Sequence, residues 1–70
     1  MDFYYFNDTA DPHGYHEVHT EDCMYLPSLT NRTLIGYCSS CAEAINEAKA
    51  EHPSLQFDGC FWCCRECHHG

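Results

Sequence analysis

Three pairs of cysteines, each pair separated by two residues, limit what this chain can fold into. They are Cys38 with Cys41, Cys60 with Cys63, and Cys64 with Cys67. This spacing is typical of tight turns that present two thiolates to one zinc ion. The chain has 70 residues, and domains this short usually rely on disulfides, a metal or a partner for stability. We therefore predict one small domain, residues 1–70, organised around its cysteines.

The apolar content also points to a metal-stabilised domain. Of the 31 hydrophobic residues, seven are Cys and five are Ala, which leaves nine Leu, Ile, Val or Met and ten aromatic residues. This is a thin core for a domain that folds without a cross-link. Because the number of cysteines is odd, a framework made only of disulfides would leave one thiol over, so we expect thiolate ligands instead of disulfides.

The charge of the chain excludes several kinds of partner. Three Lys and Arg residues stand against eleven Asp and Glu residues, for a formal net charge of -8. Arg32, Lys49 and Arg65 are scattered along the chain, so no basic patch is expected for nucleic acid or an anionic membrane. The first residues carry no export signal, and no apolar run reaches membrane length. We expect a monomeric, cytoplasmic protein, with an unidentified protein as a possible partner.

The order of elements predicts an α+β fold with two or three short strands and one helix. Residues 1–14 read as an N-terminal strand and loop, and strands are expected at Tyr15–Thr20 and Thr33–Cys38. The helix covers about residues 41–52: Ser40 and Glu43 have capping-box spacing, and Pro53 ends it. Its apolar stripe consists mainly of small residues, which predicts close packing against a sheet. Ser28–Asn31 reads as a loop, and Asp58–Gly59 as a turn before the last cysteines.

A four-ligand zinc site is the chemistry that these residues predict. Cys60 and Cys63, preceded by Asp58–Gly59, form the pair that most resembles a metal-binding turn. Two sets of residues compete to complete the tetrahedron. His19 and Cys23 are one, at the end of a strand and the turn after it. Cys38 and Cys41 are the other; cysteine spacing favours them, whereas the helical position of Cys41 favours a packing role.

Parts of the sequence resemble known families. His16–Pro27, Ser39–Ala44 and Asp58–Cys63 are similar to segments of very short uncharacterised bacterial proteins, over roughly residues 16–68. More remotely, His19 and Cys23, a Glu-Ala helix and the pair Cys60 and Cys63 follow the order found in the zinc-binding domain of the bacterial Ada methylated-DNA repair protein. The resemblance implies these four residues as zinc ligands and a small sheet with one helix. His19 replaces the first Cys of that domain, and its DNA-binding basic cluster has no counterpart here.

The remaining candidates have simpler interpretations. Cys64, Cys67, His68 and His69 are expected to form a frayed, solvent-exposed tail, although they offer groups for a second site. His16 is three residues before His19 on the predicted strand, so the two side chains lie on opposite faces. His16 is therefore expected to pack or to be solvated, not to bind the same ion. His13 lies in a loop, and His52 is expected to cap the helix. Phe61 and Trp62 are expected to shield the metal and to fill a small core.

Two functions fit these observations. The first is a zinc-binding structural or interaction module with one closed four-ligand site, which is our main prediction. The alternative is a reactive-thiol protein, either a metal carrier, a redox switch or an alkyl acceptor, that uses the surplus cysteines. We do not expect an enzyme, because the sequence carries no zinc-protease pattern, nucleophile elbow or phosphate loop. The sequence leaves open whether iron takes the place of zinc.

Overall fold

The structure, a computed structural model that describes residues 1–69, has the predicted α+β fold. The elements in chain order are β1 (Asp2–Asn7), β2 (Tyr15–Thr20), β3 (Arg32–Cys38), α1 (Cys41–Glu51) and β4 (Gln56–Gly59). Short 3₁₀ turns lie at Leu29–Asn31 and Arg65–Cys67. The described residues therefore contain four strands, one more than the highest number predicted from the sequence.

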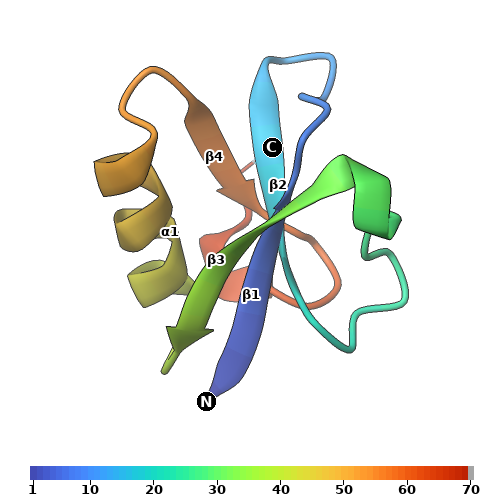
Figure 1. The fold of residues 1–70 in the computed structure, drawn as a ribbon, viewed down its shortest axis with the longest axis vertical. Helices are drawn as coiled ribbons and strands as arrows, with labels where there is room; N and C mark the ends of the chain where they lie inside the picture. The colour runs from blue at the N-terminus through green and yellow to red at the C-terminus, as the bar shows by residue number, and fades with distance from the viewer. Residues whose placement is uncertain (70) are drawn as a thin grey trace.

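The four strands form one mixed sheet in the order β3-β1-β2-β4 (Figure 1). β1 pairs antiparallel with β2 and β3, whereas β2 and β4 run parallel. Parallel pairing requires a crossover connection, which is here provided by β3 and α1. As a consequence β2 and β4 end at the same edge of the sheet, and the segments that follow them, Glu21–Cys23 and Cys60–Cys63, start side by side.

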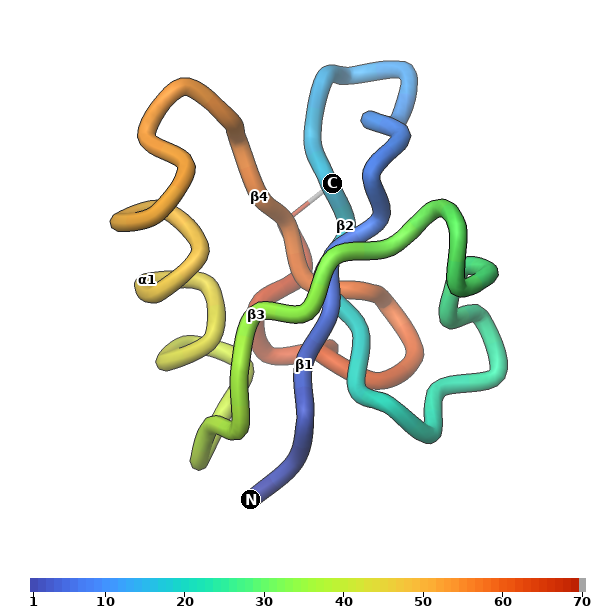
Figure 2. The backbone as a smooth tube through the Cα atoms, in the orientation of Figure 1, coloured from blue at the N-terminus to red at the C-terminus, as the bar shows by residue number. Residues whose placement is uncertain are grey.

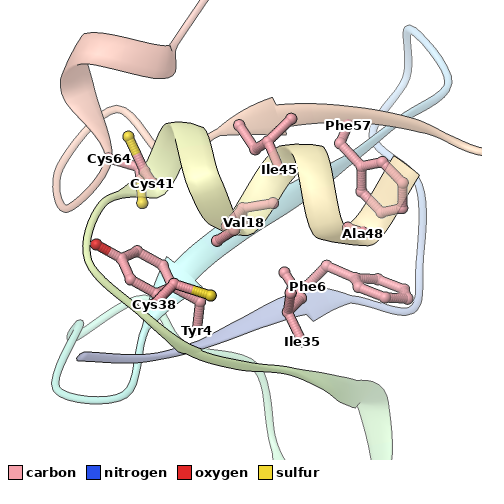
Figure 3. Close-up of a cluster of buried hydrophobic side chains, with 11 residues drawn as sticks. Tyr4, Phe6, Val18, Ile35, Cys38, Cys41, Ile45, Ala48, Phe57 and Cys64 are labelled. Carbon is pink, nitrogen blue, oxygen red and sulfur yellow. The ribbon is translucent and has the colours of Figure 1, made fainter. Parts of the chain in front are cut away.

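The core lies between α1 and one face of the sheet (Figure 3). The helix contributes its small-residue stripe, in which Cys41, Ala44, Ile45 and Ala48 are buried. Side chains alternate along a strand, so the partners Phe6 and Val18 point toward the helix while Tyr5 and His19 point to the other face. The sheet side of the core consists of Tyr4, Phe6, Val18, Ile35, Cys38 and Phe57.

The helix starts as the capping residues predict. The amide of Glu43 donates to the Ser40 hydroxyl at 3.2 Å, which satisfies one of the free amides of the first turn. The Glu43 carboxylate accepts from the backbone and the hydroxyl of Ser39, one residue before the position expected in a capping box. The last helical residue is Glu51, and the His52 amide donates to Ala48 O at 2.8 Å, so His52 is the C-cap.

The C-terminal tail differs from the prediction. The side chain of Cys64 is fully buried in the core, and Asp58 and Gly59 belong to β4 instead of forming a turn. The residues after β4 turn back and pass behind β1 and β3 in the view of Figure 2, as the orange-to-red segment shows. They are not frayed, because Cys64 supplies apolar surface that the small core lacks. Ser28–Asn31, expected to be a loop, includes a 3₁₀ turn.

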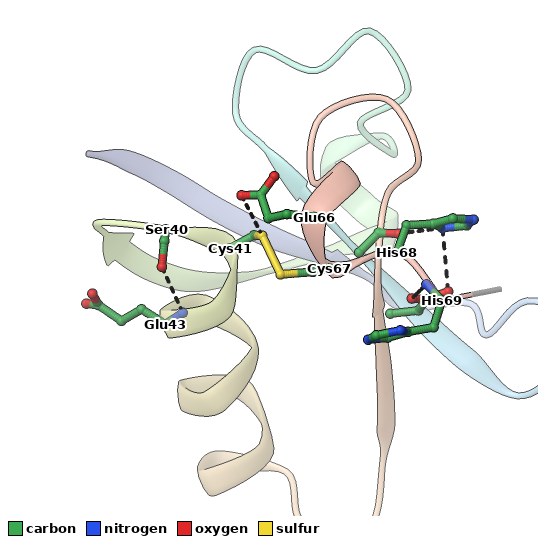
Figure 4. Close-up of a disulfide and its surroundings, with 9 residues drawn as sticks. Ser40, Cys41, Glu43, Glu66, Cys67, His68 and His69 are labelled. Carbon is green, nitrogen blue, oxygen red and sulfur yellow. Dashed lines mark hydrogen bonds and ion pairs between the residues drawn. A yellow bond between two sulfur atoms is a disulfide. The ribbon is translucent and has the colours of Figure 1, made fainter.

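A disulfide joins Cys41, the first residue of α1, to Cys67 in the tail (Figure 4). The expectation that thiolates would replace disulfides is therefore wrong for this pair. The sequence did not indicate this disulfide, because the two-residue spacing pairs Cys41 with Cys38 and Cys67 with Cys64. The cross-link holds the tail against the start of the helix, while the five other cysteines are free thiols.

Candidate metal centre

The ends of β2 and β4 bring four potential ligands together. They are His19 Nδ1 and the sulfurs of Cys23, Cys60 and Cys63, all within 4.8 Å of one another. His19 is in β2, and Cys60 follows β4 directly. Val18 pairs with Gly59, and the Cys60 amide donates to Val18 O at 2.9 Å. The register of the parallel pair therefore places His19 beside Cys60.

Three of the distances between these atoms are close to the edges of a zinc tetrahedron. Zinc–sulfur bonds of about 2.3 Å and zinc–nitrogen bonds of about 2.0 Å give edges of about 3.8 Å between two sulfurs and about 3.5 Å between sulfur and nitrogen. The structure has 3.9 Å between the sulfurs of Cys23 and Cys60. His19 Nδ1 lies 3.6 Å from Cys23 Sγ and 3.9 Å from Cys63 Sγ. All four donor atoms lie within 4.8 Å of one another, so the cluster is compatible with one ion of this size.

Backbone amides point at two of the sulfurs. The amide of Trp62 lies 3.4 Å from Cys60 Sγ, and the amide of Thr20 lies 3.4 Å from Cys63 Sγ. Amide donors stabilise sulfur in its thiolate form, which is the form that binds metal. The turn that carries Cys23 is closed by a bond from its amide to Thr20 O at 3.2 Å. Both ligand-bearing turns are therefore held by the main chain.

His19 is the most deeply buried of the four. Its side chain is 1% exposed, and burial lowers its pKa, which favours the neutral imidazole that a metal requires. Nδ1 faces the sulfurs, whereas Nε2 has no hydrogen-bond partner among residues 1–69. The Glu17 carboxylate lies 3.6 Å from Nε2. A metal on Nδ1 would leave the proton on Nε2, facing this carboxylate, in the arrangement usual for metal-binding histidines.

The thiols of the cluster also depend on a cation. Burial raises the pKa of Cys23 and of Cys60, so without a positive charge these two groups stay protonated at neutral pH. A divalent cation reverses this, because it stabilises the thiolates directly. The donor set is compatible with a metal ion.

The other predicted completion is not assembled in the structure. Cys41 is in the disulfide, and the buried thiol of Cys38 donates to the Glu47 carboxylate at 3.4 Å. Cys64 packs in the core, where burial raises its pKa well above the usual range. Neither pair therefore contributes to the cluster. The four positions that the structure brings together are those that the resemblance implied.

The remaining histidines have partners outside the cluster. His16 Nδ1 lies 2.8 Å from Asn7 O, and the ring packs edge-on against Phe6, as expected for a residue that alternates with His19. His68 Nδ1 lies 2.9 Å from Gly59 O, and the amide of His69 donates to Asp58 at 2.8 Å (Figure 4). These contacts correct the prediction of a frayed tail, since both histidines attach it to the end of β4, although His69 itself is exposed as predicted.

Phe61 and Trp62 do not fill a small core, which corrects that part of their predicted role. Trp62 is 66% exposed and stacks on Tyr25 at 5.7 Å between ring centroids, so it does not fill a core. Phe61 is 38% exposed, and the Arg65 guanidinium lies over its ring, 4.8 Å from the ring centroid. The sequence analysis did not identify Glu17, whose carboxylate faces His19 Nε2. Its position two residues before His19, on the same face of the strand, is the sequence signal for this contact.

Comparison of the chain with protein-family models, curated proteins and solved structures finds no match. Among residues 1–69 no helix is long and apolar enough to cross a membrane.

Proposed function

We propose that this protein is a small zinc-binding structural or interaction module, with His19, Cys23, Cys60 and Cys63 as its four ligands. The observation that carries the proposal is the match between the distances in the cluster and the edges of a zinc tetrahedron. Three sulfurs and one imidazole nitrogen are a common ligand set for structural zinc. This soft set disfavours magnesium and calcium, which prefer oxygen ligands.

A four-ligand site suits a structural role more than a catalytic one. Four protein ligands fill the zinc tetrahedron and leave no position for a reacting water. The ion would join two turns whose cysteines, Cys23 and Cys60, are 37 residues apart. Apparent zinc binding to small domains is worth roughly 10 kcal/mol or more, which exceeds what so thin a core supplies. Zinc would therefore stabilise the edge of the sheet where β2 and β4 end.

Exposure of the ligands defines the test against the reactive-thiol alternative. Cys60 is buried, whereas Cys23 and Cys63 are half-buried and could meet a reagent. Alkylation of the zinc-loaded protein at neutral pH, followed by mass spectrometry of each cysteine, separates the two functions. The structural module predicts that all three ligand thiols are protected until a chelator is added. Rapid modification of Cys23 or Cys63 with zinc retained would instead favour the alternative.

The histidines of β2 allow a matched test of the ligand set. His19→Ala removes the proposed nitrogen ligand, and His16→Ala removes a histidine three residues earlier that points to the other face. We expect His16→Ala to bind one zinc per chain as the unmodified protein does, whereas His19→Ala binds at least tenfold more weakly. Substitution with Co²⁺ should give the visible absorption bands of a tetrahedral thiolate site, and these bands should change only in His19→Ala. Equal zinc affinity in the two variants would contradict the proposal.

The charge of the loaded site suggests the kind of partner for an interaction module. One divalent ion and three thiolates sum to -1, so zinc binding leaves the acidic character of the chain unchanged. A protein partner with a basic surface is the partner that this charge fits, and nucleic acid and membranes remain disfavoured. We propose that the module acts as a monomer in the cytoplasm.

A further inference from the structure

The disulfide and the metal cluster hold the same tail at two neighbouring points. Cys67 lies four residues after Cys63 and joins the tail to the start of α1, whereas Cys60 and Cys63 join it to the end of β2. The tail between them is one hydrogen-bonded unit: the Cys64 amide donates to Cys60 O, and the Cys67 amide donates to Cys64 O, at 2.9 and 3.0 Å. A change at Cys67 is therefore transmitted through one backbone to the metal ligands.

The two cysteines of the disulfide differ in exposure. Cys41 is 1% exposed, but Cys67 is half-buried and lines a surface hollow of about 200 Å³ between α1 and the tail. Lys49, one of only three Lys and Arg residues in the chain, lies on the helix side of this hollow. Glu66 also lines the hollow, so a small thiol that carries both carboxylates and an amino group, such as glutathione, would find a partner for each charge there. An incoming thiolate would reach Cys67 and release Cys41.

The surroundings of Cys41 suit the thiol that this release creates. Glu66 Oε1 lies 3.1 Å from Cys41 Sγ, so the carboxylate can accept a hydrogen bond from the Cys41 thiol (Figure 4). Cys41 is also the first residue of an 11-residue helix, where free backbone amides stabilise a thiolate during the exchange. When the disulfide is reduced, the buried Cys41 thiol can therefore donate its hydrogen bond to Glu66.

We propose that Cys41 and Cys67 form a reversible redox site for low-molecular-weight thiols, and that the disulfide tightens the metal centre. In the forward reaction the Cys67 thiolate attacks glutathione disulfide, forms a mixed disulfide and releases one glutathione. The Cys41 thiolate then attacks the Cys67 sulfur and releases the second glutathione. The two protein thiols lose two electrons and two protons, and glutathione disulfide gains both.

The coupling between the two sites is reciprocal. The disulfide fixes the tail in the position that Cys60 and Cys63 require, so the oxidised protein should bind zinc more tightly than the reduced protein. By linkage, zinc must favour the disulfide by the same factor. We expect a factor of about 10, within the range usual for coupled sites. This second part rests on the zinc-binding function proposed above, whereas the exchange with glutathione does not.

Two equilibrium measurements on the full chain test the proposal. In the first, the protein is equilibrated with and without zinc in buffers of varied glutathione ratio, quenched with acid, and the Cys41–Cys67 disulfide is quantified by mass spectrometry. In the second, zinc affinity is measured by competition with a chromophoric chelator for the oxidised protein and for the protein reduced with a phosphine. Cys41→Ser/Cys67→Ser removes the pair, and Cys38→Ser is the control that removes a buried thiol outside it.

The proposal predicts that zinc shifts the glutathione equilibrium about tenfold toward the disulfide and that oxidation lowers the zinc Kd by the same factor. Cys38→Ser should keep both effects, and the double variant should bind zinc like the reduced protein under either condition. Equal zinc affinities for the oxidised and reduced protein, or no Cys41–Cys67 disulfide at any glutathione ratio, would overturn it. If neither form binds zinc, the proposed function fails, and the glutathione titration still decides whether the pair is a redox site.

Discussion

Gly59 offers a sharp test of how the end of β4 supports the metal ligands. A Cβ placed on Gly59 would lie 2.5 Å from Cys64 O, 2.8 Å from Cys67 Cβ and 2.9 Å from the Cys67 carbonyl carbon. Two of these atoms are backbone atoms of the tail, and the third, Cys67 Cβ, is bonded directly to the backbone. None of them is the end of a flexible side chain that could rotate away from the added Cβ. Ordinary contact starts at about 3.4 Å, so Gly59→Ala must move the Cys64 carbonyl by about 0.9 Å, the difference between 3.4 and 2.5 Å.

The cost of this displacement follows from packing. An added methyl group in a close-packed site typically costs about 1–3 kcal/mol, and the lack of a flexible neighbour places Gly59→Ala at the upper end of that range. Cys60 follows Gly59 directly, and Cys63 precedes the carbonyl that must move. We therefore also expect the zinc Kd to rise at least tenfold, which corresponds to about 1.4 kcal/mol.

Gly14→Ala is the matched control for Gly59→Ala. Gly14 has φ +89° and nothing within 4 Å of its added Cβ, so this variant costs about 1–2 kcal/mol of backbone strain but touches nothing near the cluster. Urea unfolding of the zinc-loaded protein and chelator competition measure both effects. We expect both variants to lose stability and only Gly59→Ala to lose zinc affinity. Unchanged zinc affinity in Gly59→Ala would refute the argument that the tail positions the ligands.

Three further predictions concern other parts of the structure. Glu17→Ala should weaken zinc binding about tenfold in chelator competition, since the carboxylate no longer faces His19 Nε2; no change would remove Glu17 from the site. Ser40→Ala should lower the free energy of unfolding by about 1 kcal/mol, measured in urea, because it removes the cap of α1. Burial raises the pKa of Cys38 to about 11, above the unfolded value of 9.0. Between these two values the Cys38 thiol keeps its proton in the folded state and loses it in the unfolded chain. Its contribution to the free energy of unfolding is therefore full below pH 9 and falls as the pH rises toward 11. Urea unfolding across this range should show a weaker decline for Cys38→Ala, and equal declines would contradict this.

The sequence predicts most of the local structure because the signals for it are local. The cap at Ser40, the small-residue stripe and Pro53 determine the helix, and alternation places Val18 and His19 on opposite faces of β2. β4 was missed because its four residues, Gln56–Gly59, include an Asp-Gly pair that resembles a turn. They form a strand because they pair with β2, which is a long-range effect.

The candidate site was predictable in its members but not in its surroundings. The two-residue spacing indicates Cys60 and Cys63, whereas the choice between His19 with Cys23 and the competing cysteines depends on parallel pairing of β2 with β4. That pairing is not visible in the sequence. Cysteine spacing alone therefore favoured Cys38 and Cys41, which the structure does not bring to the turn of Cys60 and Cys63. The Cys41–Cys67 disulfide was missed for a similar reason, since its two members meet only when the tail folds against α1.

X-ray absorption of the zinc-loaded protein, together with native mass spectrometry of the same sample, decides whether His19, Cys23, Cys60 and Cys63 hold one zinc ion. We predict one zinc per chain with three sulfur ligands at about 2.3 Å and one nitrogen ligand at about 2.0 Å. His19→Ala should lose the nitrogen contribution, and His16→Ala should retain it. A chain that binds no zinc, or a first shell of four sulfurs that is unchanged in His19→Ala, would contradict the assignment of this centre.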